Sequence, residues 1–566
     1  MKIKSLHTNI SIRSILRWLW RSSADNRLQA VLNTVIGLLE TVVSLASVWA
    51  MKNAIDIASQ QVGLQEQPVG GIPQSLRNDL LWAIAIMAGL ILSTFALRVA
   101  SVWVRNILGI KAQNRMQQRM LSRILHSQYQ GRDALHSGDV LNRLEQDVAT
   151  VVNFVAETLP DMLSVFTLFL GAFCYLFMLD YRLALAIVVL FPLFLLLSRL
   201  YVGRMRQLNR DVRESDSMVQ SILQDSVQNR VLVKALESED SLVDRLDDEH
   251  RILRKKVVKK TYFSVFSNVV VSMGFASGYL VAFGWSAFRL AAGTLTYGGM
   301  TAFLQLVNRI QGPARNLARM VPKFVSVFTA AERLMMFEDI PMEEEKAPQL
   351  LEGRCGVEFR DVSFAYADEP DKVIFSHFSF NFRPGTCTAI MGRTGAGKTT
   401  LIRMILALLS PVSGNVYIYN KVERKEASPS TRCNIIYVPQ GNTLLSGTIR
   451  DNLLLGNVDA TEAEMYEALR MACADFVDAL PDGIDTIVTE NGGGLSEGQA
   501  QRLCIARALL RKSSLMILDV ATSALDEGTE RQLLKNLFEN RSRTVIFITH
   551  RPAVLKYCDA HVEIDR

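Results

Sequence analysis

The sequence predicts a multi-domain protein in which an α-helical region with six membrane spans precedes an α/β domain. Three observations support this fold class. Long apolar runs concentrate in the first part of the chain, and the mean hydropathy of the whole is +0.17, which is high for a soluble protein. After residue 355, short β-prone segments alternate with helical ones. A charged segment bounded by Pro341 and Pro348 separates the two parts, as is typical of a linker.

Six segments are apolar and long enough to be candidate spans, since a helix that crosses a bilayer needs about 20 residues. The sixth is the least apolar and is expected to follow a short turn at Gly293–Gly298. The segments are Leu28–Met51, Leu80–Leu97, Met162–Leu179, Leu183–Leu197, Thr261–Phe288 and Leu290–Asn308. The predicted domains are an amphipathic segment on the membrane surface at 1–26, a membrane domain at 27–338, a linker at 339–354 and the α/β domain at 355–566.

Basic residues orient these spans. Two long stretches, Arg98–Arg143 and Arg199–Lys260, are rich in Arg and Lys, whereas the connecting segment Ser59–Ser75 has neither. Because basic residues stay on the cytoplasmic side, both stretches, both termini and the α/β domain are expected in the cytoplasm. The stretches are predicted to continue the spanning helices and to reverse near His136–Asp139 and Gln228–Arg230.

The first span carries a single charge, Glu40. A charge inside a membrane is costly unless it faces protein or water, so Glu40 is by default a candidate functional residue. A structural bond between helices explains it equally well. The net charge of +6 is too mild to indicate a nucleic-acid partner. The seven cysteines form no C-x-x-C pair and are interpreted as reduced thiols, not as a disulfide framework.

The α/β domain contains a phosphate-binding motif. Gly392-Arg-Thr-Gly-Ala-Gly-Lys-Thr399 matches G-x-x-x-x-G-K-[ST] between an apolar β-prone segment and a helical one. Backbone N–H groups and the helix N-terminus would face an anion there. Lys398 would reach the β- and γ-phosphates, and the Thr399 hydroxyl would hold Mg²⁺. The predicted ATP-binding residues of this segment are Gly392, Arg393, Thr394, Gly395, Ala396, Gly397, Lys398, Thr399 and Thr400.

Further motifs follow in a fixed order, and each alone is also compatible with an ordinary strand or helix end. Tyr366 ends a predicted strand and would stack on adenine. Gln440 ends another strand and would contact Mg²⁺ and the attacking water. Ser496-Glu-Gly-Gln499 precedes an amphipathic helix, a second anion-binding helix end at which Ser496, Gly498 and Gln499 are predicted to bind ATP. Asp519 ends a buried strand as a second Mg²⁺ anchor, and His550 ends the last.

Taken together, these motifs resemble those of ATP-binding cassette (ABC) transporters, and six spans ahead of one cassette resemble an exporter-type half-transporter. Gly138–Leu144 and Val231–Leu236 are similar to the coupling-helix regions of that family. The resemblance implies that two chains pair and hold ATP and Mg²⁺ between the phosphate loop of one and the signature of the other. It implies catalytic roles for Gln440, Asp519 and His550, and docking of the two cytoplasmic reversals onto the cassettes.

The sequence departs from that family at two positions. Glu497 stands where the signature often has Gly, a minor change. Val520 stands where a Glu usually polarises the attacking water, and losing a general base costs about 10²–10⁴-fold in rate. Three hypotheses remain: this chain is the degenerate half of a heterodimer, a slowly hydrolysing homodimer that uses His550 and Gln440, or an ATP-trapping variant. The first is slightly favoured.

The resemblance implies a transport ATPase that exports or flips an amphipathic substrate across a bacterial inner membrane. Its expected partners are a second half-transporter, membrane lipid and the substrate, which the sequence does not identify. The alternative is a non-hydrolysing, ATP-binding regulatory subunit of a heterodimeric membrane complex, and Val520 motivates it.

Overall fold

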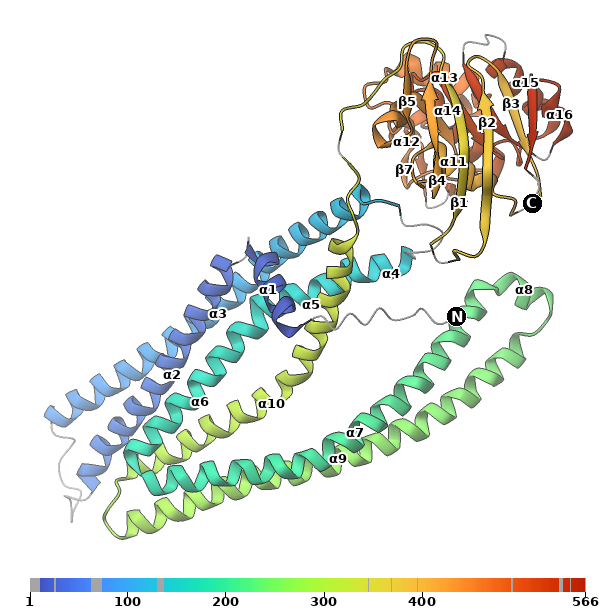
Figure 1. Cartoon of the computed structure of the whole chain (residues 1–566). Coiled ribbons are helices and arrows are strands. Elements are labelled where there is room, and N and C mark those ends of the chain that lie inside the picture. Colours follow the sequence, from blue (N-terminus) through green and yellow to red (C-terminus); the bar gives the residue numbers. More distant parts are fainter. Residues whose placement is uncertain are drawn as a thin grey trace. The chain divides into compact units, whose positions relative to one another are not determined.

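The computed structural model describes residues 11–24, 27–62, 74–129, 137–344, 346–367, 369–393, 395–489, 492–538, 543–549 and 551–564. The chain forms two compact units, Met1–Leu121 with Val140–Phe337, and Ser122–Asp139 with Glu338–Arg566. Figure 1 shows long helices in the first and a mixture of strands and helices in the second. The finer predicted bounds of the surface segment and the linker stay predictions.

Long helices build the membrane region, and the chain continues without a break from several of the predicted spans into the basic stretches (Figure 1). In order, the elements are α1 (Ile12–Ser22), α2 (Arg27–Val62), α3 (Gln74–His126), α4 (Ser137–Asn142), η2 (Arg143–Asp147), α5 (Val148–Asn153), η3 (Phe154–Thr158), α6 (Leu159–Leu179), α7 (Tyr181–Gln228), α8 (Arg230–Ala235), α9 (Glu239–Ala291) and α10 (Tyr297–Asp339).

The first five predicted spans each lie within one helix, namely α2, α3, α6, α7 and α9. The predicted start of the sixth span is wrong, because Leu290 belongs to the last turn of α9 and α10 begins at Tyr297. Apolar composition does not show where a helix breaks; Gly293, with φ of 68°, provides the left-handed turn. Among the described residues, four helical stretches are long and apolar enough to cross a membrane: Arg27–Ser59, Gln74–His126, Gly138–Leu179 and Glu239–Ala291.

Two polar contacts fix the ends of the spans. The buried Asp180 caps α7 by accepting from the backbone N–H groups of Arg182 (2.9 Å) and Leu183 (3.2 Å). Trp285 of α9 donates to the same carboxylate (2.9 Å), and Arg289 forms an ion pair with it. The turn between α6 and α7 is therefore tied to α9 by charge-assisted hydrogen bonds.

A second contact joins α2 to the start of α10. Gly298 donates its N–H to Asp56 (2.9 Å), which also pairs with Lys52 (3.0 Å). A side chain at position 298 would meet the Lys52 carbonyl oxygen at 2.2 Å, so only glycine permits this approach of the two backbones.

The segment between α4 and α6 contains two π-helical turns, η2 and η3, which the sequence pattern did not predict. The second lies beside Asn33 of α2, whose side-chain amide donates to the Ala156 carbonyl (2.8 Å). Arg105 of α3 pairs with Glu157 in the same turn (3.1 Å). These long-range bonds hold a backbone form that hydrophobic periodicity alone does not specify.

Two sheets form the framework of the second unit. The antiparallel sheet has the order β2-β1-β4-β5 and the parallel sheet the order β11-β3-β10-β9-β6. The strands are β1 (Gly356–Ala365), β2 (Val373–Phe382), β3 (Cys387–Met391), β4 (Ser413–Tyr419), β5 (Arg424–Glu426), β6 (Ile435–Val438), β7 (Gly447–Thr448), β8 (Ile487–Val488), β9 (Leu515–Asp519), β10 (Thr544–Ile548) and β11 (Ala560–Glu563).

The helices of this unit are packed around the parallel sheet, and β9 and β10 are buried along their whole length. Buried parallel strands of this kind read as continuous apolar runs, which is why the sequence predicted them. The helical elements are α11 (Lys398–Ile405), η4 (Pro429–Asn434), α12 (Ile449–Leu454), α13 (Glu462–Met471), η5 (Asp475–Ala479), η6 (Gly483–Asp485), α14 (Glu497–Leu509), α15 (Glu527–Phe538) and α16 (Pro552–Leu555).

Candidate nucleotide site and membrane cavity

The phosphate loop connects β3 to α11 at the carboxyl edge of the parallel sheet. Gly392 and Gly397 have φ of 142° and 107°, backbone forms that L side chains rarely adopt. A Cβ on Gly392 would meet the carbonyl oxygen of Ile564 at 2.4 Å. Lys398 folds back over the loop and donates to the carbonyl oxygens of Gly392 (2.7 Å) and Arg393 (3.0 Å). The loop therefore has the strand–turn–helix form that the motif predicts for phosphate binding.

The remaining loop residues divide by exposure. Thr399, at the start of α11, is exposed, as are Arg393 and Gly395, whereas Ala396 and Thr400 are buried. Thr400 shares a hydrogen bond of 3.0 Å with the hydroxyl of Tyr366. Thr394 lies outside the described residues.

Tyr366 lies in the core beside the antiparallel sheet. It is only 6% exposed, and its ring meets Phe364 edge to face at 5.0 Å between centroids. Adenine stacking by Tyr366 stays a prediction, and it requires one ring face to become accessible.

Asp519 ends β9 and is 2% exposed. Burial raises the pKa of its carboxyl, while the nearby Lys398 and Arg403 and a hydrogen bond with Tyr437 oppose that rise. Burial, together with the charge of Asp519, raises the pKa of Tyr437 to about 12, so this phenol stays protonated. The arrangement is a buried carboxylate surrounded by two cations and a phenol. Tyr437 and Arg403 were not predicted; their positions on β6 and α11 become relevant only once the sheet order is known.

Val520 follows Asp519 directly and has a strained backbone. Its φ is 52°, a left-handed form that costs an L residue roughly 1–2 kcal/mol and is unusual for a β-branched side chain. The backbone is held by hydrogen bonds from Val520 N–H to Ile548 (3.1 Å) and from Ser523 N–H to Val520 (3.3 Å). Its side chain packs against the core cluster of the antiparallel sheet and offers no proton acceptor.

The signature segment forms a second group, at the start of α14. Ser496 is exposed and caps the helix reciprocally with Gln499: its N–H donates to Gln499 Oε1 (2.8 Å), and its Oγ accepts from Gln499 N–H (3.2 Å). Gly498 lies against the loop between β9 and α15, since a Cβ at position 498 would meet the Ala524 carbonyl oxygen at 2.8 Å. Gln501 ties α14 to the same loop through Ser523 (3.2 Å).

Of the two residues predicted to position the attacking water, the structure describes one. Gln440 is exposed in a bend just after β6. His550 lies outside the described residues. Its neighbour Arg551 pairs with the buried Glu530 (2.8 Å) and donates to the carbonyl of Ser523 (2.9 Å). Sequence reasoning did not single out Arg551, which connects the segment after β10 to the loop after Val520.

The donor set suits Mg²⁺ bound together with ATP. Magnesium prefers hard oxygen ligands and is usually held by one or two carboxylates plus phosphates and water. Asp519, the Thr399 hydroxyl and the Gln440 amide supply such oxygens. Within the described ranges there is no group of three or more His, Cys, Asp or Glu side chains suited to a metal ion, so the residues do not form a closed protein cage.

A cavity of about 290 Å³ lies in the membrane region between α2, α3 and α10. Arg309 of α10 reaches into it and donates to the hydroxyls of Ser44 and Ser47, the latter at 3.2 Å. Arg98 of α3 pairs with Glu40 of α2 (3.2 Å), so the one charge of the first predicted span takes part in an ion pair between helices. The cavity is lined by Ser44, Ser47, Met87, Ile91, Thr94, Phe95, Arg98 and Arg309.

Arg309 lies some distance along α10 from the contact that joins this helix to α2. Asp56 and Gly298 form that contact, and Ser44 and Arg309 each lie about three turns further along their helices, which is about 18 Å at 1.5 Å per residue. An arginine held by hydroxyls between predicted spanning helices is expensive to bury and is a candidate functional residue.

A helical membrane region joined to a phosphate-loop domain with a signature helix defines an ATP-dependent membrane transporter. Residues 30–314 match the family described as the ABC transporter transmembrane region, and residues 375–523 match the ABC transporter family. The chain therefore belongs to the ABC transporters and is an integral membrane protein. The predicted family and fold class are confirmed.

Relatives and a solved structure agree with this assignment. An ATP-dependent lipid A-core flippase of Chromobacterium violaceum is 29% identical over 87% of this chain and 84% of its own. A Staphylococcus aureus protein named for multidrug export, an ATP-binding/permease protein, is 31% identical over 76% and 75%. The structure of a bacterial Atm1-family ABC exporter with ATP bound has a TM-score of 0.77 at 24% identity, covering 96% of this chain and 95% of that one. This last likeness shows that the chain has the exporter fold.

Proposed function

We propose that this chain is one half of an ATP-driven exporter that moves an amphipathic, acidic substrate and whose own hydrolytic centre is degenerate. The observation that carries the proposal is the contrast at the edge of the parallel sheet. The phosphate loop, Lys398 and Asp519 retain the groups for ATP and Mg²⁺, while Val520 lacks the base for hydrolysis. ATP is expected to bind at this site and to turn over slowly there.

Pairing of two chains follows from the signature segment. Ser496 is exposed at an N-terminus that offers N–H groups and a positive helix end, so it is suited to a phosphate brought by a second chain. In a heterodimer, this chain lends Ser496 to a partner's competent site while its own phosphate loop holds ATP. The second candidate function, a non-hydrolysing regulatory subunit, is favoured by the same Val520.

The membrane cavity supports a substrate with both apolar and acidic parts. Met87, Ile91 and Phe95 form an apolar wall, and the two arginines outnumber the single Glu40. The relatives include a lipid A-core flippase and a protein named for multidrug export. A phosphorylated glycolipid matches this charge better than a cationic drug does, because arginine binds phosphate through paired hydrogen bonds.

The transporter and the regulator are distinguished by ATP turnover of the purified chain in lipid nanodiscs. If the native chain is nearly silent and Val520→Glu restores turnover that a phosphorylated glycolipid stimulates, the chain has the machinery of an exporter. If Val520→Glu binds ATP but remains silent with every substrate tested, the regulatory function is the better account. Rapid turnover by the native chain alone contradicts the degenerate site.

The substrate class is tested with Arg309→Gln in the Val520→Glu background. Removing the charge should abolish stimulation by a phosphorylated glycolipid and leave the basal rate and any stimulation by tetraphenylphosphonium unchanged. Asn308→Ala, at the exposed neighbouring position, is the matched control. Equal stimulation of both variants by the glycolipid would show that Arg309 does not recognise the substrate.

A further inference from the structure

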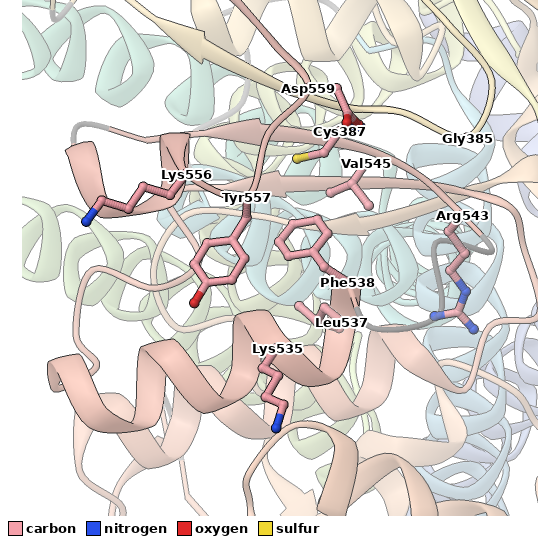
Figure 2. A pocket seen from close by; sticks show the side chains of 10 residues that line it. All are labelled: Gly385, Cys387, Lys535, Leu537, Phe538, Arg543, Val545, Lys556, Tyr557 and Asp559. Atoms are coloured by element: carbon pink, nitrogen blue, oxygen red, sulfur yellow. The ribbon is translucent and has the colours of Figure 1, made fainter.

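A cavity in the cassette lies at the amino edge of the parallel sheet, where β3 and β10 begin. The phosphate loop follows the other end of β3, so the two sites are separated by the length of that strand. The cavity has a volume of about 270 Å³ and is open to solvent. Figure 2 shows its ten lining residues: Gly385, Cys387, Lys535, Leu537, Phe538, Arg543, Val545, Lys556, Tyr557 and Asp559.

The lining is basic and aromatic. The lining residues include three cations, Lys535 of α15, Arg543 before β10 and Lys556 after α16, and a single carboxylate, that of Asp559. That carboxylate already accepts the N–H of Cys387 (2.9 Å). Burial lowers the pKa of the Arg543 guanidinium, a cost that a bound anion would reduce.

Two rings form one wall of the cavity. Phe538 and Tyr557 stack with 6.0 Å between centroids and 17° between planes, and both appear beside the opening in Figure 2. Aromatic faces next to cations favour a planar anionic ligand over a purely ionic one.

A thiol that lines this cavity meets a second thiol. Cys387 lines it, is 5% exposed, and has its Sγ 2.8 Å from the Sγ of Cys558. The backbone holds the two residues together, because Asp559 N–H donates to the Cys387 carbonyl (2.9 Å). The hydrogen bond from Cys387 lowers the pKa of the Cys558 thiol, against the opposing effects of burial and Asp559. Two thiols in contact are candidates for a disulfide bond.

We propose that this cavity is a modification site for small anionic disulfides, at which Cys387 and Cys558 are oxidised to an intramolecular disulfide. Cys387 loses its proton to water and attacks one sulfur of the bound disulfide, forming a mixed disulfide and releasing one small thiolate. Cys558 then loses its proton, attacks the Cys387 sulfur and releases the second small thiolate. Two protein thiols are oxidised, and one disulfide is reduced to two thiols, so electrons and atoms balance.

The charge around the thiols separates this site from ordinary packed cysteines. The cations that line the cavity would attract an anionic disulfide to it. Cys433, by contrast, donates to the Ser430 carbonyl (3.3 Å), and Cys473 accepts from the Asn536 amide (3.5 Å). Only the Cys387–Cys558 pair, among the described cysteines, combines contact, a cavity and three cations.

The test uses the full chain, reduced and then freed of reductant in nanodiscs. Dithiobis(nitrobenzoate), an aromatic dianion, is compared with dithiodipyridine, a neutral aromatic disulfide, and products are located by peptide mass spectrometry without reduction. We expect a Cys387–Cys558 disulfide and two thionitrobenzoates released for each pair, with no retained adduct. Joining residues 171 apart in sequence should also raise the unfolding temperature of the cassette by several degrees.

Variants separate recognition from simple reactivity. Lys556→Gln should slow the reaction with the dianion by about tenfold and leave that with the neutral probe unchanged, because only charge attraction is lost. Lys421→Gln, an exposed lysine elsewhere in the cassette, is the matched control. Cys558→Ser should retain one adduct on Cys387.

Three outcomes overturn the proposal. A lasting adduct on either cysteine in the native chain, without the intramolecular bond, rules out the second step. Equal effects of Lys556→Gln on both probes rule out recognition of the anion. Modification of Cys433 or Cys473 before the pair shows that general thiol reactivity dominates.

Discussion

The two halves of the proposed nucleotide site share one edge of one sheet and differ in the side chains that they offer. The phosphate loop after β3 has the residues predicted to bind ATP, with Lys398 folded onto the loop carbonyls. The position after β9 is Val520, which offers no proton acceptor and occupies a left-handed backbone form that does not suit it. Only β10 lies between the two strands. The comparison teaches that different residues supply the groups predicted for binding and for hydrolysis, so a chain can carry the first set without the second.

Restoring the acid should have the largest effect on this contrast. Val520→Glu is expected to raise ATP turnover by about 10²–10⁴-fold, the usual contribution of a general base. Val520→Gln, which has the same size and no basic carboxylate, is the matched control and should stay silent. The measurement is phosphate release in nanodiscs; equal rates for Gln and Glu would show that the base lies elsewhere.

Removing the Lys398 side chain from the phosphate loop should have the next largest effect, on ATP affinity. Lys398→Ala is expected to weaken ATP binding by about 10–100-fold, the value of a lost charged hydrogen bond. The measurement is nucleotide affinity by equilibrium binding, with Lys421→Ala as control. Undiminished affinity would show that the loop backbone alone retains the phosphates.

Replacing Val520 by glycine tests whether the strained backbone at this position lowers the stability of the protein. Val520→Gly removes the roughly 1–2 kcal/mol penalty of the left-handed backbone form. Glycine also gives the unfolded chain more conformational freedom, which lowers the stability of the folded state by about 0.5–1 kcal/mol. We expect the unfolding midpoint of the nucleotide-free protein to rise by about 2 °C with ATP affinity unchanged. A fall in the midpoint would mean that packing of the valine side chain outweighs the strain.

The smallest expected effect is the pH dependence of stability that Asp519 causes. The pKa of Asp519 is raised by burial, so its ionised form costs stability above that raised value. This cost disappears as pH falls through the raised pKa toward the ordinary value of 3.8, below which both states are protonated. Asp519→Asn should therefore give a slightly higher midpoint at neutral pH, a difference that narrows with acidification, and should lose Mg²⁺ dependence of ATP binding. A difference that widens on acidification would contradict the burial argument.

Much of the architecture was predictable because its signals are local. Long apolar runs gave five helices with their spans inside them, and the phosphate loop followed from glycines and a lysine at fixed spacing. The predicted start of the sixth span was wrong because Leu290, which belongs to α9, is as apolar as the residues of α10 that follow. The π-turns η2 and η3 depend on partners in α2 and α3, which no local pattern reveals.

The sites were less complete from sequence because they depend on strand order. Tyr437 reaches Asp519 only after β6 pairs with β9, and Arg403 does so only once α11 lies beside that edge of the sheet. Cys387 meets Cys558 only after β11 pairs with β3. The sequence interpretation of scattered reduced thiols did not detect this contact. The roles of Gln440, Ser496 and the undescribed Thr394 and His550 remain predictions.

The meeting of Gly392 with Ile564 has a consequence for synthesis. The strand β11 pairs with β3, Ile564 donates to the Met391 carbonyl (2.9 Å), and its own carbonyl lies where a side chain at 392 would be. The ribosome makes the phosphate loop long before it makes this cover. Until β11 docks, the loop lacks the neighbour that limits its shape, so we expect ATP to favour folding of the cassette less before this step than after it.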